Sequence, residues 1–393
     1  MKNKVDTMKN LTIVADSNIA SLDEFFNPVA LGQNTEQQVQ VIRVAGRDIN
    51  AQLMANVQPD VLLIRSVTSI NESLLSENNS VKFVGSATIG TDHVDQEYLA
   101  ERNITFANAA GCSKHSVAQY VLTAILTLRP QYWQQSTKPL TLGIIGLGNI
   151  GSTLAQYAND LGWKILGYDP LLATSDINNA SLEQVLSQSD IVSLHVPLTD
   201  KKDTDAQGTF SNSISNNVSD YPTRHLINAE TLTLMSPHTM LINSARGPVI
   251  DAAALEADID ATERQVVLDV FEHEPQISES LLSKLAIATP HIAGYTLEGK
   301  LRGTQIIYDA LCEKLAVLPV LSMHQLLPLN TYLWFELKEH PDRLQKFYDI
   351  RKDDAALRNK ITNGKVKGSD FDQLRRDYHL RREWQAQTIS VTI

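Results

Sequence analysis

The sequence predicts an α/β protein built on parallel β-sheets. Short runs of apolar residues recur along the chain, and helix-like stretches separate them. The runs are continuous rather than alternating, which indicates sheets covered by helices on both faces. The strand-then-helix order favours parallel strands joined by right-handed crossovers. In chain order the expected strands lie in 11–16, 61–69, 81–87, 141–146, 164–169, 190–196, 239–245 and 265–271.

Three segments depart from this rhythm. Residues 113–128 carry apolar residues at helical spacing after a serine suited to cap a helix, so we expect a long connecting helix there. The segment around 200–222 is rich in Ser, Asn and Asp and predicts a flexible surface insertion. From residue 319 to 393 charged amphipathic stretches predict a separate small α+β unit.

Composition narrows the function classes. The 393 residues suffice for two or three domains, and the formal net charge of -11 argues against nucleic acid or an anionic membrane as the main partner. A local basic site for a phosphate remains compatible with that charge. The two cysteines provide no disulfide framework, and the apolar run near the N-terminus is too short for a signal peptide. We therefore expect a cytoplasmic protein.

A glycine-rich motif follows the expected strand that starts at residue 141. Gly146, Gly148 and Gly151 form G-x-G-x-x-G, a weak signal alone, but here a helix-like stretch comes next and a further strand ends at Asp169. In this context the glycines allow a tight turn, close approach of a pyrophosphate and close helix–strand contact. Asp169 would accept hydrogen bonds from the ribose hydroxyls and repel a 2′-phosphate. The motif predicts binding of NAD rather than NADP.

Titratable residues follow several of the later strands. Arg246 lies in "INSARGPVID", Asp269 and Glu274 lie in "LDVFEHEP", and His291 lies in "TPHIAGYT". Ligands of open α/β sheets gather at the carboxyl ends of strands, where these residues fall. Oxidation of a 2-hydroxy acid needs a hydride acceptor, a base for the hydroxyl proton and an anchor for the carboxylate. Arginine suits the carboxylate, and histidine titrates near neutral pH.

Each of these residues also has an ordinary structural interpretation. Arg246 would otherwise form a surface salt bridge, Glu274 would precede a turn proline, Asp269 would end a strand, and His291 would be a buried ring. Their occurrence together favours the catalytic interpretation, with Glu274 fixing the tautomer of His291. The remaining histidines considered, His93, His115, His195, His238 and His273, are interpreted as structural or exposed.

The sequence gives little support to a metal site or to a catalytic cysteine. Cys112 and His115 form an isolated C-x-x-H without a third ligand at suitable spacing, so we expect no metal site. Cys112 as a nucleophile is conceivable in "AGCSKH", but the sequence ties no base to it.

The motifs "GLGNIG", "INSARGPVID", "LDVFEHEP" and "TPHIAGYT" together resemble those of the D-isomer-specific 2-hydroxyacid dehydrogenases. Within that family, "IRSVTSINESLL", "KFVGSATIGTDHVD", "AAGCSKHSVAQYV" and "HIAGYTLEGKLRGT" are closest to the members that oxidise 4-phospho-D-erythronate with NAD in pyridoxal 5'-phosphate biosynthesis. The tail, "YDIRKDDAALR" with "FDQLRRDYHLRREW", resembles the dimerisation domain of those members and implies a homodimer.

The resemblance implies roles for individual residues. Arg246, Glu274 and His291 would be the catalytic set, with His291 the proton donor and acceptor. Ser66, Thr88 and Tyr295 match positions that contact the substrate. The positions that match cofactor contacts, with the glycine motif included, are Gly146, Gly148, Asn149, Ile150, Gly151, Asp169, Val196, Ser244, Ala245, Arg246, Asp269 and Gly294.

The architecture implied by the resemblance has two Rossmann-like lobes and an appended domain. Residues 1–113 with 296–318 would form the substrate-binding lid, 114–295 the NAD-binding lobe, and 319–393 the C-terminal α+β dimerisation domain. Two alternatives stay open: another D-2-hydroxyacid dehydrogenase, such as one acting on phosphoglycerate or hydroxypyruvate, and an NAD-sensing binding protein on the same scaffold. Candidates to anchor a substrate phosphate are Arg65 and the basic pair Arg351 and Lys352.

Overall fold

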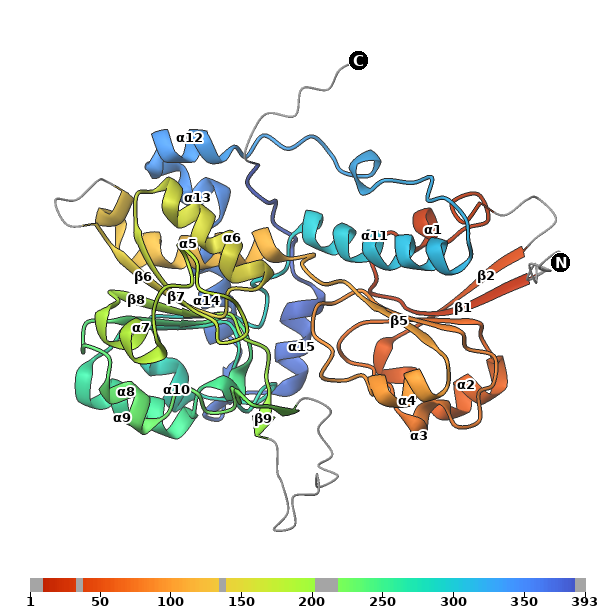
Figure 1. Ribbon diagram of the computed structural model, residues 1–393, viewed down its shortest axis with the longest axis horizontal. Coiled ribbons are helices and arrows are strands. Elements are labelled where there is room, and N and C mark those ends of the chain that lie inside the picture. Colours follow the sequence, from red (N-terminus) through yellow and green to blue (C-terminus); the bar gives the residue numbers. More distant parts are fainter. Residues whose placement is uncertain (1–9, 33–37, 134–138, 202–217, 386–393) are drawn as a thin grey trace, which may run out of the picture. The chain divides into compact units, whose positions relative to one another are not determined.

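The computed structural model describes residues 10–32, 38–133, 139–201 and 218–385. Contacts between Cα atoms divide the chain into two compact units. The first unit comprises Met1–Ser113 with Glu298–Pro328, and the second comprises Lys114–Leu297 with Leu329–Ile393. Each unit is built around its own parallel sheet, so the expected α/β class is confirmed (Figure 1).

The first unit contains a five-stranded parallel sheet in the order β2-β1-β3-β4-β5. Buried side chains of α2, α3 and α4 pack on one face with those of the central strands, and α1 and α11 lie on the other face (Figure 1). Its strands are β1 (Asn10–Asp16), β2 (Gln38–Val44), β3 (Val61–Ile64), β4 (Phe83–Ser86) and β5 (Thr105–Asn108). Its helices are α1 (Leu22–Phe25), α2 (Ala51–Val57), α3 (Glu72–Leu75), α4 (Gln96–Glu101) and α11 (Leu297–Lys314).

The second unit contains a six-stranded parallel sheet in the order β14-β12-β11-β8-β6-β7. The chain enters at β6, moves outward to β7, and then crosses back to β8 on the other side of β6. The point between β6 and β8 where the strand order reverses is where open α/β sheets bind ligands. The strands are β6 (Thr141–Ile145), β7 (Lys164–Tyr168), β8 (Ile191–Leu194), β11 (Met240–Asn243), β12 (Val266–Leu268) and β14 (Ile287–Ala288).

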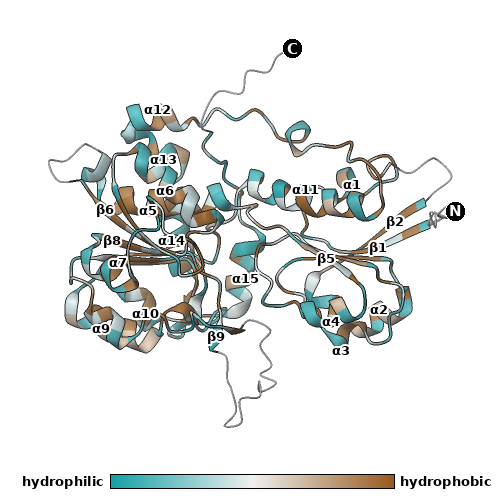
Figure 2. Ribbon diagram, in the orientation of Figure 1, coloured by the Kyte–Doolittle hydropathy of each residue, from teal (hydrophilic) through white to brown (hydrophobic). Residues whose placement is uncertain are grey.

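Helices cover both faces of this sheet. The long helix α5 (Lys114–Leu128) and α6 (Asn149–Asp160) pack on one face, and α5 confirms the expected connecting helix. The opposite face is covered by α7 (Leu182–Gln188), α8 (Ala229–Thr233), α9 (Ala252–Thr262) and α10 (Glu279–Lys284). The strands are strongly hydrophobic while the helices carry polar residues on their outer sides, as expected for a sheet buried on both faces (Figure 2).

Residues 329–385, here called the C-terminal segment, pack on the core of the second unit. Trp334, Leu337 and Trp384 join the hydrophobic cluster of α5 and α6, while Leu357 and Phe371 join the cluster of the opposite face. A small antiparallel sheet of order β13-β16-β15 ties the segment to residues before α10. The segment contains α12 (Trp334–Glu339), α13 (Leu344–Phe347), α14 (Ile350–Arg358), β15 (Ile361–Thr362), β16 (Lys365–Val366) and α15 (Gly368–Arg376), and the third strand of the sheet is β13 (Ile277–Ser278).

Most of the insertion expected at 200–222 lies outside the described residues. Its two ends are described, and they pair as short parallel strands, β9 (Asp200–Lys201) and β10 (Val218–Ser219). None of the helices within the described ranges is long and apolar enough to cross a membrane.

Candidate active site

The glycine motif occupies the turn between β6 and α6, at the strand-order reversal. Gly146 has φ +89, a left-handed conformation that side chains rarely adopt. A Cβ on Gly151 would lie 2.0 Å from the carbonyl oxygen of Gly146, so only glycine allows this approach of helix to strand. Around Gly148, by contrast, a Cβ would meet nothing within 4 Å. The turn therefore leaves open space at the N-terminus of α6, where backbone N–H groups attract an anion.

Asp169 follows β7 and is fixed by the same turn. Its Oδ2 accepts a hydrogen bond from Leu147 N at 2.9 Å, and its Oδ1 accepts one from Leu171 N at 3.0 Å. Asn178 closes the loop by donating to the Asp169 carbonyl oxygen at 3.0 Å. The carboxylate is thus held in place beside the glycine turn, which suits a group that must meet ribose hydroxyls.

The turn after β11 presents a polar atom without a protein partner. Ser244 Oγ is buried and has no hydrogen-bond partner among the described residues. Asn243 shapes this turn, because its Oδ1 accepts from Ala245 N at 3.0 Å and its Nδ2 donates to the Arg246 carbonyl oxygen at 2.9 Å. An open glycine cradle, a fixed Asp169 and an unpaired Ser244 hydroxyl, which follow β6, β7 and β11 of one sheet, fit a dinucleotide.

His291 and Glu274, which the sequence predicted as partners, are joined by a hydrogen bond. His291 Nδ1 lies 2.8 Å from Glu274 Oε1, and both side chains are about seven-tenths buried. Burial alone would raise the pKa of Glu274. The charge of His291, its hydrogen bond, the Phe271 N–H and the charge of Arg375 outweigh burial and hold that pKa below its usual value. Glu274 is therefore ionised at neutral pH and can stabilise an imidazolium.

Asp269 organises the loop that carries His291. Its Oδ1 accepts hydrogen bonds from Thr289 Oγ1 at 2.6 Å and Ile292 N at 2.8 Å, and its Oδ2 accepts one from Ala293 N at 2.9 Å. Complete burial raises the pKa of Asp269, while the charge of His291 and these hydrogen bonds oppose the rise. Both carboxylate oxygens are engaged with the protein, so the sequence-based expectation of a cofactor contact at Asp269 stays a prediction.

The other expected groups of the second unit also lie at strand ends. Arg246 directly follows the β11 turn, and its Nη1 donates to the Ala245 carbonyl oxygen at 2.8 Å. Val196 follows β8 and packs against the hydrophobic cluster on the face covered by α7, α8, α9 and α10. Asn149 and Ile150 begin α6. Gly294 lies in the loop after His291, where its carbonyl oxygen accepts from Thr296 N at 3.2 Å.

His195, which the sequence left as structural or exposed, directly follows β8 and is half-buried. Its Nε2 lies 2.9 Å from Ser193 Oγ, and its Nδ1 has no hydrogen-bond partner among the described residues. Burial lowers the pKa of His195 to about 3, so the ring is neutral at physiological pH.

Sequence reasoning missed an arginine that holds the loop carrying His291, called the catalytic loop below because a catalytic role is expected for His291. Arg381 Nη1 donates to the carbonyl oxygens of Ile292 at 2.9 Å and Tyr295 at 3.4 Å, and Nη2 donates to the Ala293 carbonyl oxygen. Its guanidinium carbon also lies 4.4 Å from the centroid of the Tyr348 ring. One side chain of the C-terminal segment thus satisfies the backbone acceptors directly after His291. The basic run "LRREW" marks Arg381 in the sequence, but nothing in the neighbouring residues indicates that it contacts the loop after His291.

Tyr295 is also surrounded by the C-terminal segment. Its ring lies edge-on to Tyr378, with centroids 6.0 Å apart, and the guanidinium carbon of Arg375 is 5.8 Å from its centroid. Ser66 and Thr88, the other expected substrate contacts, belong to the first unit, where they follow β3 and β4. Thr88 Oγ1 lies 3.0 Å from Ser86 Oγ, and Ser66 is exposed.

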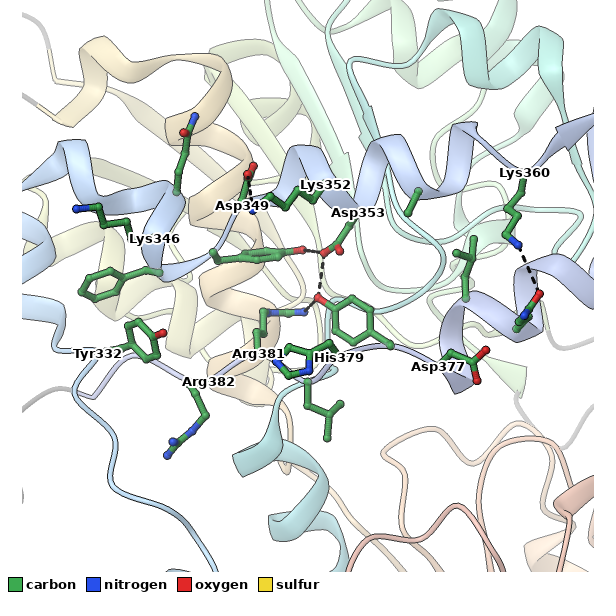
Figure 3. A pocket seen from close by; sticks show the side chains of 18 residues that line it. Tyr332, Lys346, Asp349, Lys352, Asp353, Lys360, Asp377, His379, Arg381 and Arg382 are labelled. Carbon is green, nitrogen blue, oxygen red and sulfur yellow. Dashed lines mark hydrogen bonds and ion pairs between the residues drawn. The ribbon is translucent and has the colours of Figure 1, made fainter.

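Residues of the C-terminal segment line an open pocket of about 640 Å³, and none of the expected catalytic residues is part of its lining. Asp353 lies within it and accepts hydrogen bonds from Tyr348 Oη at 2.7 Å and Tyr378 Oη at 2.9 Å (Figure 3). Burial raises the pKa of Asp353, and it raises the pKa of Tyr378 to about 12. Among the described residues, no group of three or more His, Cys, Asp or Glu is placed to hold a metal ion.

Comparison with known families agrees with this arrangement. The catalytic domain of the D-isomer specific 2-hydroxyacid dehydrogenases matches residues 14–320. A domain of unknown function matches residues 336–392. Among solved structures, D-lactate dehydrogenase from Aquifex aeolicus, complexed with NAD and lactic acid, is 25% identical with a TM-score of 0.57, covering 77% of this chain and 94% of that one. A glyoxylate reductase from Paecilomyes thermophila, 21% identical, shares the fold with a TM-score of 0.62 over 78% of this chain and 96% of that one.

Curated relatives match over almost the whole chain. One from Psychrobacter cryohalolentis, named erythronate-4-phosphate dehydrogenase, is 98% identical over 98% of this chain and 100% of its own length. Relatives with the same name are 90% identical in Psychrobacter arcticus, over 96% and 100% of the two chains, and 46% identical in Acinetobacter baumannii, over 96% and 98%. The chain therefore belongs to the D-isomer specific 2-hydroxyacid dehydrogenases, within the group of relatives named erythronate-4-phosphate dehydrogenase.

Proposed function

We propose that this chain oxidises 4-phospho-D-erythronate to (R)-3-hydroxy-2-oxo-4-phosphobutanoate, with NAD as the cofactor, as a step in pyridoxal 5'-phosphate biosynthesis. The observation that carries the proposal is the 2.8 Å hydrogen bond between His291 and Glu274, after a strand of the same sheet that carries the dinucleotide-type glycine turn. The names of relatives up to 98% identical support the choice of substrate.

The proton of the substrate hydroxyl would move to His291. Because Nδ1 faces the ionised Glu274, the neutral ring carries its proton on Nδ1, and Nε2 is left as the nitrogen that accepts. Glu274 holds this tautomer and stabilises the imidazolium that forms, as a carboxylate does in other histidine-based sites. Reduction would reverse the transfer, with Nε2 returning the proton to the substrate oxygen.

The other proposed contacts divide the remaining tasks. Arg246 would hold the substrate carboxylate through its planar guanidinium, and Ser66, Thr88 and Tyr295 would contact the rest of the substrate. When bound, NAD supplies the acceptor for the hydride from the substrate's C2. The residues proposed to hold NAD are Gly146, Gly148, Asn149, Ile150, Gly151, Asp169, Val196, Ser244, Ala245, Arg246, Asp269 and Gly294.

The domain organisation and assembly belong to the same proposal. Residues 1–113 with 296–318 would bind substrate, 114–295 would bind NAD, and 319–393 would mediate a homodimer in the cytoplasm. Light scattering on the purified full chain tests the dimer, and a monomer across micromolar concentrations would contradict it.

A substrate panel tests the activity. The purified protein is assayed in both directions with 4-phospho-D-erythronate, 3-phosphoglycerate, hydroxypyruvate and their redox partners, using NAD(H) and NADP(H) in parallel. We expect the highest kcat/KM for the phosphorylated four-carbon acid with NAD. A higher value for any other acid would reject the substrate assignment, and an equal value with NADP would reject the role given to Asp169.

The proton-transfer role has its own test. A positioned general base contributes roughly 10²–10⁴-fold to rate, so His291→Asn is expected to lose that much kcat while NAD binding, measured by quenching of tryptophan fluorescence, stays within about threefold. A kcat within about tenfold of the wild-type value would show that His291 does not move the proton.

A further inference from the structure

We propose that Arg375, on α15 of the C-terminal segment, binds the phosphate group of the substrate. The inference rests on the proposed function, because it assigns the anion subsite of that same site. Arg375 is one residue from the end of α15 (Gly368–Arg376) and was not singled out by any sequence motif.

The first observation is that Arg375 is largely buried without a strong partner. Its side chain is 17% exposed, and its Nε is buried with no hydrogen-bond partner among the described residues. Asp372 Oδ1 lies 4.0 Å from Nη1, too far for a hydrogen bond. Arginine stays charged in proteins, and a buried charge without hydrogen bonds is costly. The buried Nε therefore has no acceptor from the described part of the protein and is left to bind an anion from outside the chain.

The second observation is where this guanidinium lies. Its carbon is 5.8 Å from the ring centroid of Tyr295 and 5.8 Å from that of Phe371. Tyr295 lies four residues after His291 on the catalytic loop and is an expected substrate contact. The positive charge of Arg375 also helps lower the pKa of Glu274, the partner of His291. Arg375 thus lies beside the groups proposed to act on the substrate.

The third step is chemical. The proposed substrate carries a carboxylate at one end and a phosphate at the other, so it needs two cationic contacts in a chain whose formal net charge is -11. Arg246 is assigned to the carboxylate. A guanidinium beside aromatic rings keeps its in-plane N–H groups for an anion, and its fork matches two phosphate oxygens.

The phosphate anchors that the sequence suggested, Arg65, Arg351 and Lys352, suit this role less well than Arg375. The Lys352 side chain is 82% exposed, and its Nζ lies 3.5 Å from Asp349 Oδ2. Lys352 is therefore solvated and already paired with a carboxylate. Arg351 is exposed on α14. Arg65 lies in the first unit and already has an interaction partner within the protein.

The neighbouring arginine provides a matched control. Arg376 is 62% exposed and lies 3.7 Å from Asp377, so Arg376→Gln removes the same charge from the same helix at a solvated position. Arg375→Gln, Arg375→Lys and Arg376→Gln are assayed with 4-phospho-D-erythronate and with D-erythronate, which lacks the phosphate. Inorganic phosphate is titrated as a competitive inhibitor of each protein, and circular dichroism and light scattering check fold and assembly.

We expect Arg375→Gln to lower kcat/KM for the phosphorylated acid by about 100-fold, the loss typical of a charged hydrogen-bonded contact, mainly through KM. The same change should alter kcat/KM for D-erythronate by less than about threefold and should weaken inhibition by inorganic phosphate. Arg375→Lys should recover part of the loss because it keeps the charge without the fork. Arg376→Gln should match the wild type.

Equal losses for both acids, or a shift to monomer with Arg375→Gln, would overturn the proposal, because Arg375 would then support structure or assembly. An unchanged preference for the phosphorylated acid would overturn it as well. If the wild type itself shows no such preference, the proposed function fails instead. Arg375 is still tested in that case, since unaltered inhibition by inorganic phosphate would exclude it as an anion contact.

Discussion

His291 occupies a backbone conformation that few residues other than glycine adopt. Its φ is +57, in the left-handed region, which costs of order 1 kcal/mol for such a residue. Its N–H donates to the Asp269 carbonyl oxygen at 2.7 Å, and the Asp269 carboxylate binds the next two N–H groups. These bonds hold the turn that directs the ring towards Glu274. The hydrogen bonds of Asp269 therefore help to set the geometry of the His291–Glu274 pair.

Removing the charge of Glu274 should slow the reaction without unfolding the protein. Glu274→Gln keeps the side-chain size but loses the carboxylate that stabilises the imidazolium and fixes the Nδ1–H tautomer. We expect kcat to fall roughly 10–10³-fold, with KM for NAD little changed. Steady-state kinetics measure the loss.

The control for this variant is Glu279→Gln, which removes an exposed carboxylate at the start of α10. It should retain wild-type kcat. A Glu274→Gln enzyme with full activity would mean that the Glu274–His291 contact has no catalytic role.

The half-buried His195 should make the protein acid-sensitive. Because its folded-state pKa is lowered from 6.5 to about 3, the unfolded chain binds more protons between these values. The stability contributed by the neutral ring is present above pH 6.5 and is lost as the pH falls. Between pH 7 and pH 5 the free energy of unfolding should drop by about 2 kcal/mol more in the wild type than in His195→Gln.

Urea unfolding at pH 7, 6 and 5 measures this difference. His238→Gln, at an exposed position, is the control and should follow the wild type. Parallel curves for the wild type and His195→Gln would show that His195 does not titrate between the folded and unfolded states.

At the scale of elements, the sequence located the central strands and one edge strand, β7, and missed the other three edge strands of the two large sheets. The apolar runs coincide with β1, β3, β4, β6, β7, β8, β11 and β12. The structure adds β2 and β5 at the edges of the first sheet and β14 at an edge of the second. Edge strands need no continuous apolar run, because one side is solvated. β2 alternates between exposed and partly buried residues, and β14 has only two residues.

In the candidate site, too, some residues could be predicted from the sequence and others could not. Arg246, Glu274 and His291 each lie in a short motif that follows a strand, so local sequence was enough to propose them. Arg381 acts on Ile292 from 89 residues away along the chain, and Arg375 reaches Tyr295 from the same segment. Such contacts depend on tertiary packing, which periodicity and motif spacing do not contain.

The clamp formed by Arg381 should stabilise the catalytic loop. Arg381→Gln leaves the carbonyl oxygens of Ile292, Ala293 and Tyr295 without this donor in a buried place. We expect the free energy of unfolding to fall by more than about 2 kcal/mol and kcat to fall at least tenfold at temperatures where the variant is folded. Thermal unfolding and steady-state kinetics measure both.

The adjacent Arg382 is the comparison, because its Nη1 donates to the Leu329 carbonyl oxygen at 3.1 Å, away from the catalytic loop. Arg382→Gln should lose less stability and retain kcat. Equal behaviour of the two variants would show that the loop does not depend on Arg381.

At the scale of the whole molecule, the C-terminal segment is part of the core of the second unit. Trp334, Leu337, Tyr348, Phe371 and Trp384 are all buried there, and the Trp334 and Trp384 rings stack with centroids 5.6 Å apart. Burial of each large apolar side chain contributes about 1.5–3 kcal/mol. The five together therefore contribute about as much as the 5–15 kcal/mol that typically separates folded from unfolded protein.

Deleting residues 329–393 should consequently unfold the second unit rather than release an active, smaller enzyme. The truncated chain would expose the surfaces of α5 and α6 that cover Trp334 and Trp384, and it would lose the Arg381 clamp on the catalytic loop. We expect insoluble protein, or soluble protein without cooperative thermal unfolding and without NAD binding. A chain that ends at Gln385 keeps every described residue of the segment and should behave as the full chain does. A soluble, cooperatively folding and active product of the 329–393 deletion would show that the segment is a separable appendage, and the stabilisation attributed to its buried side chains would then be wrong.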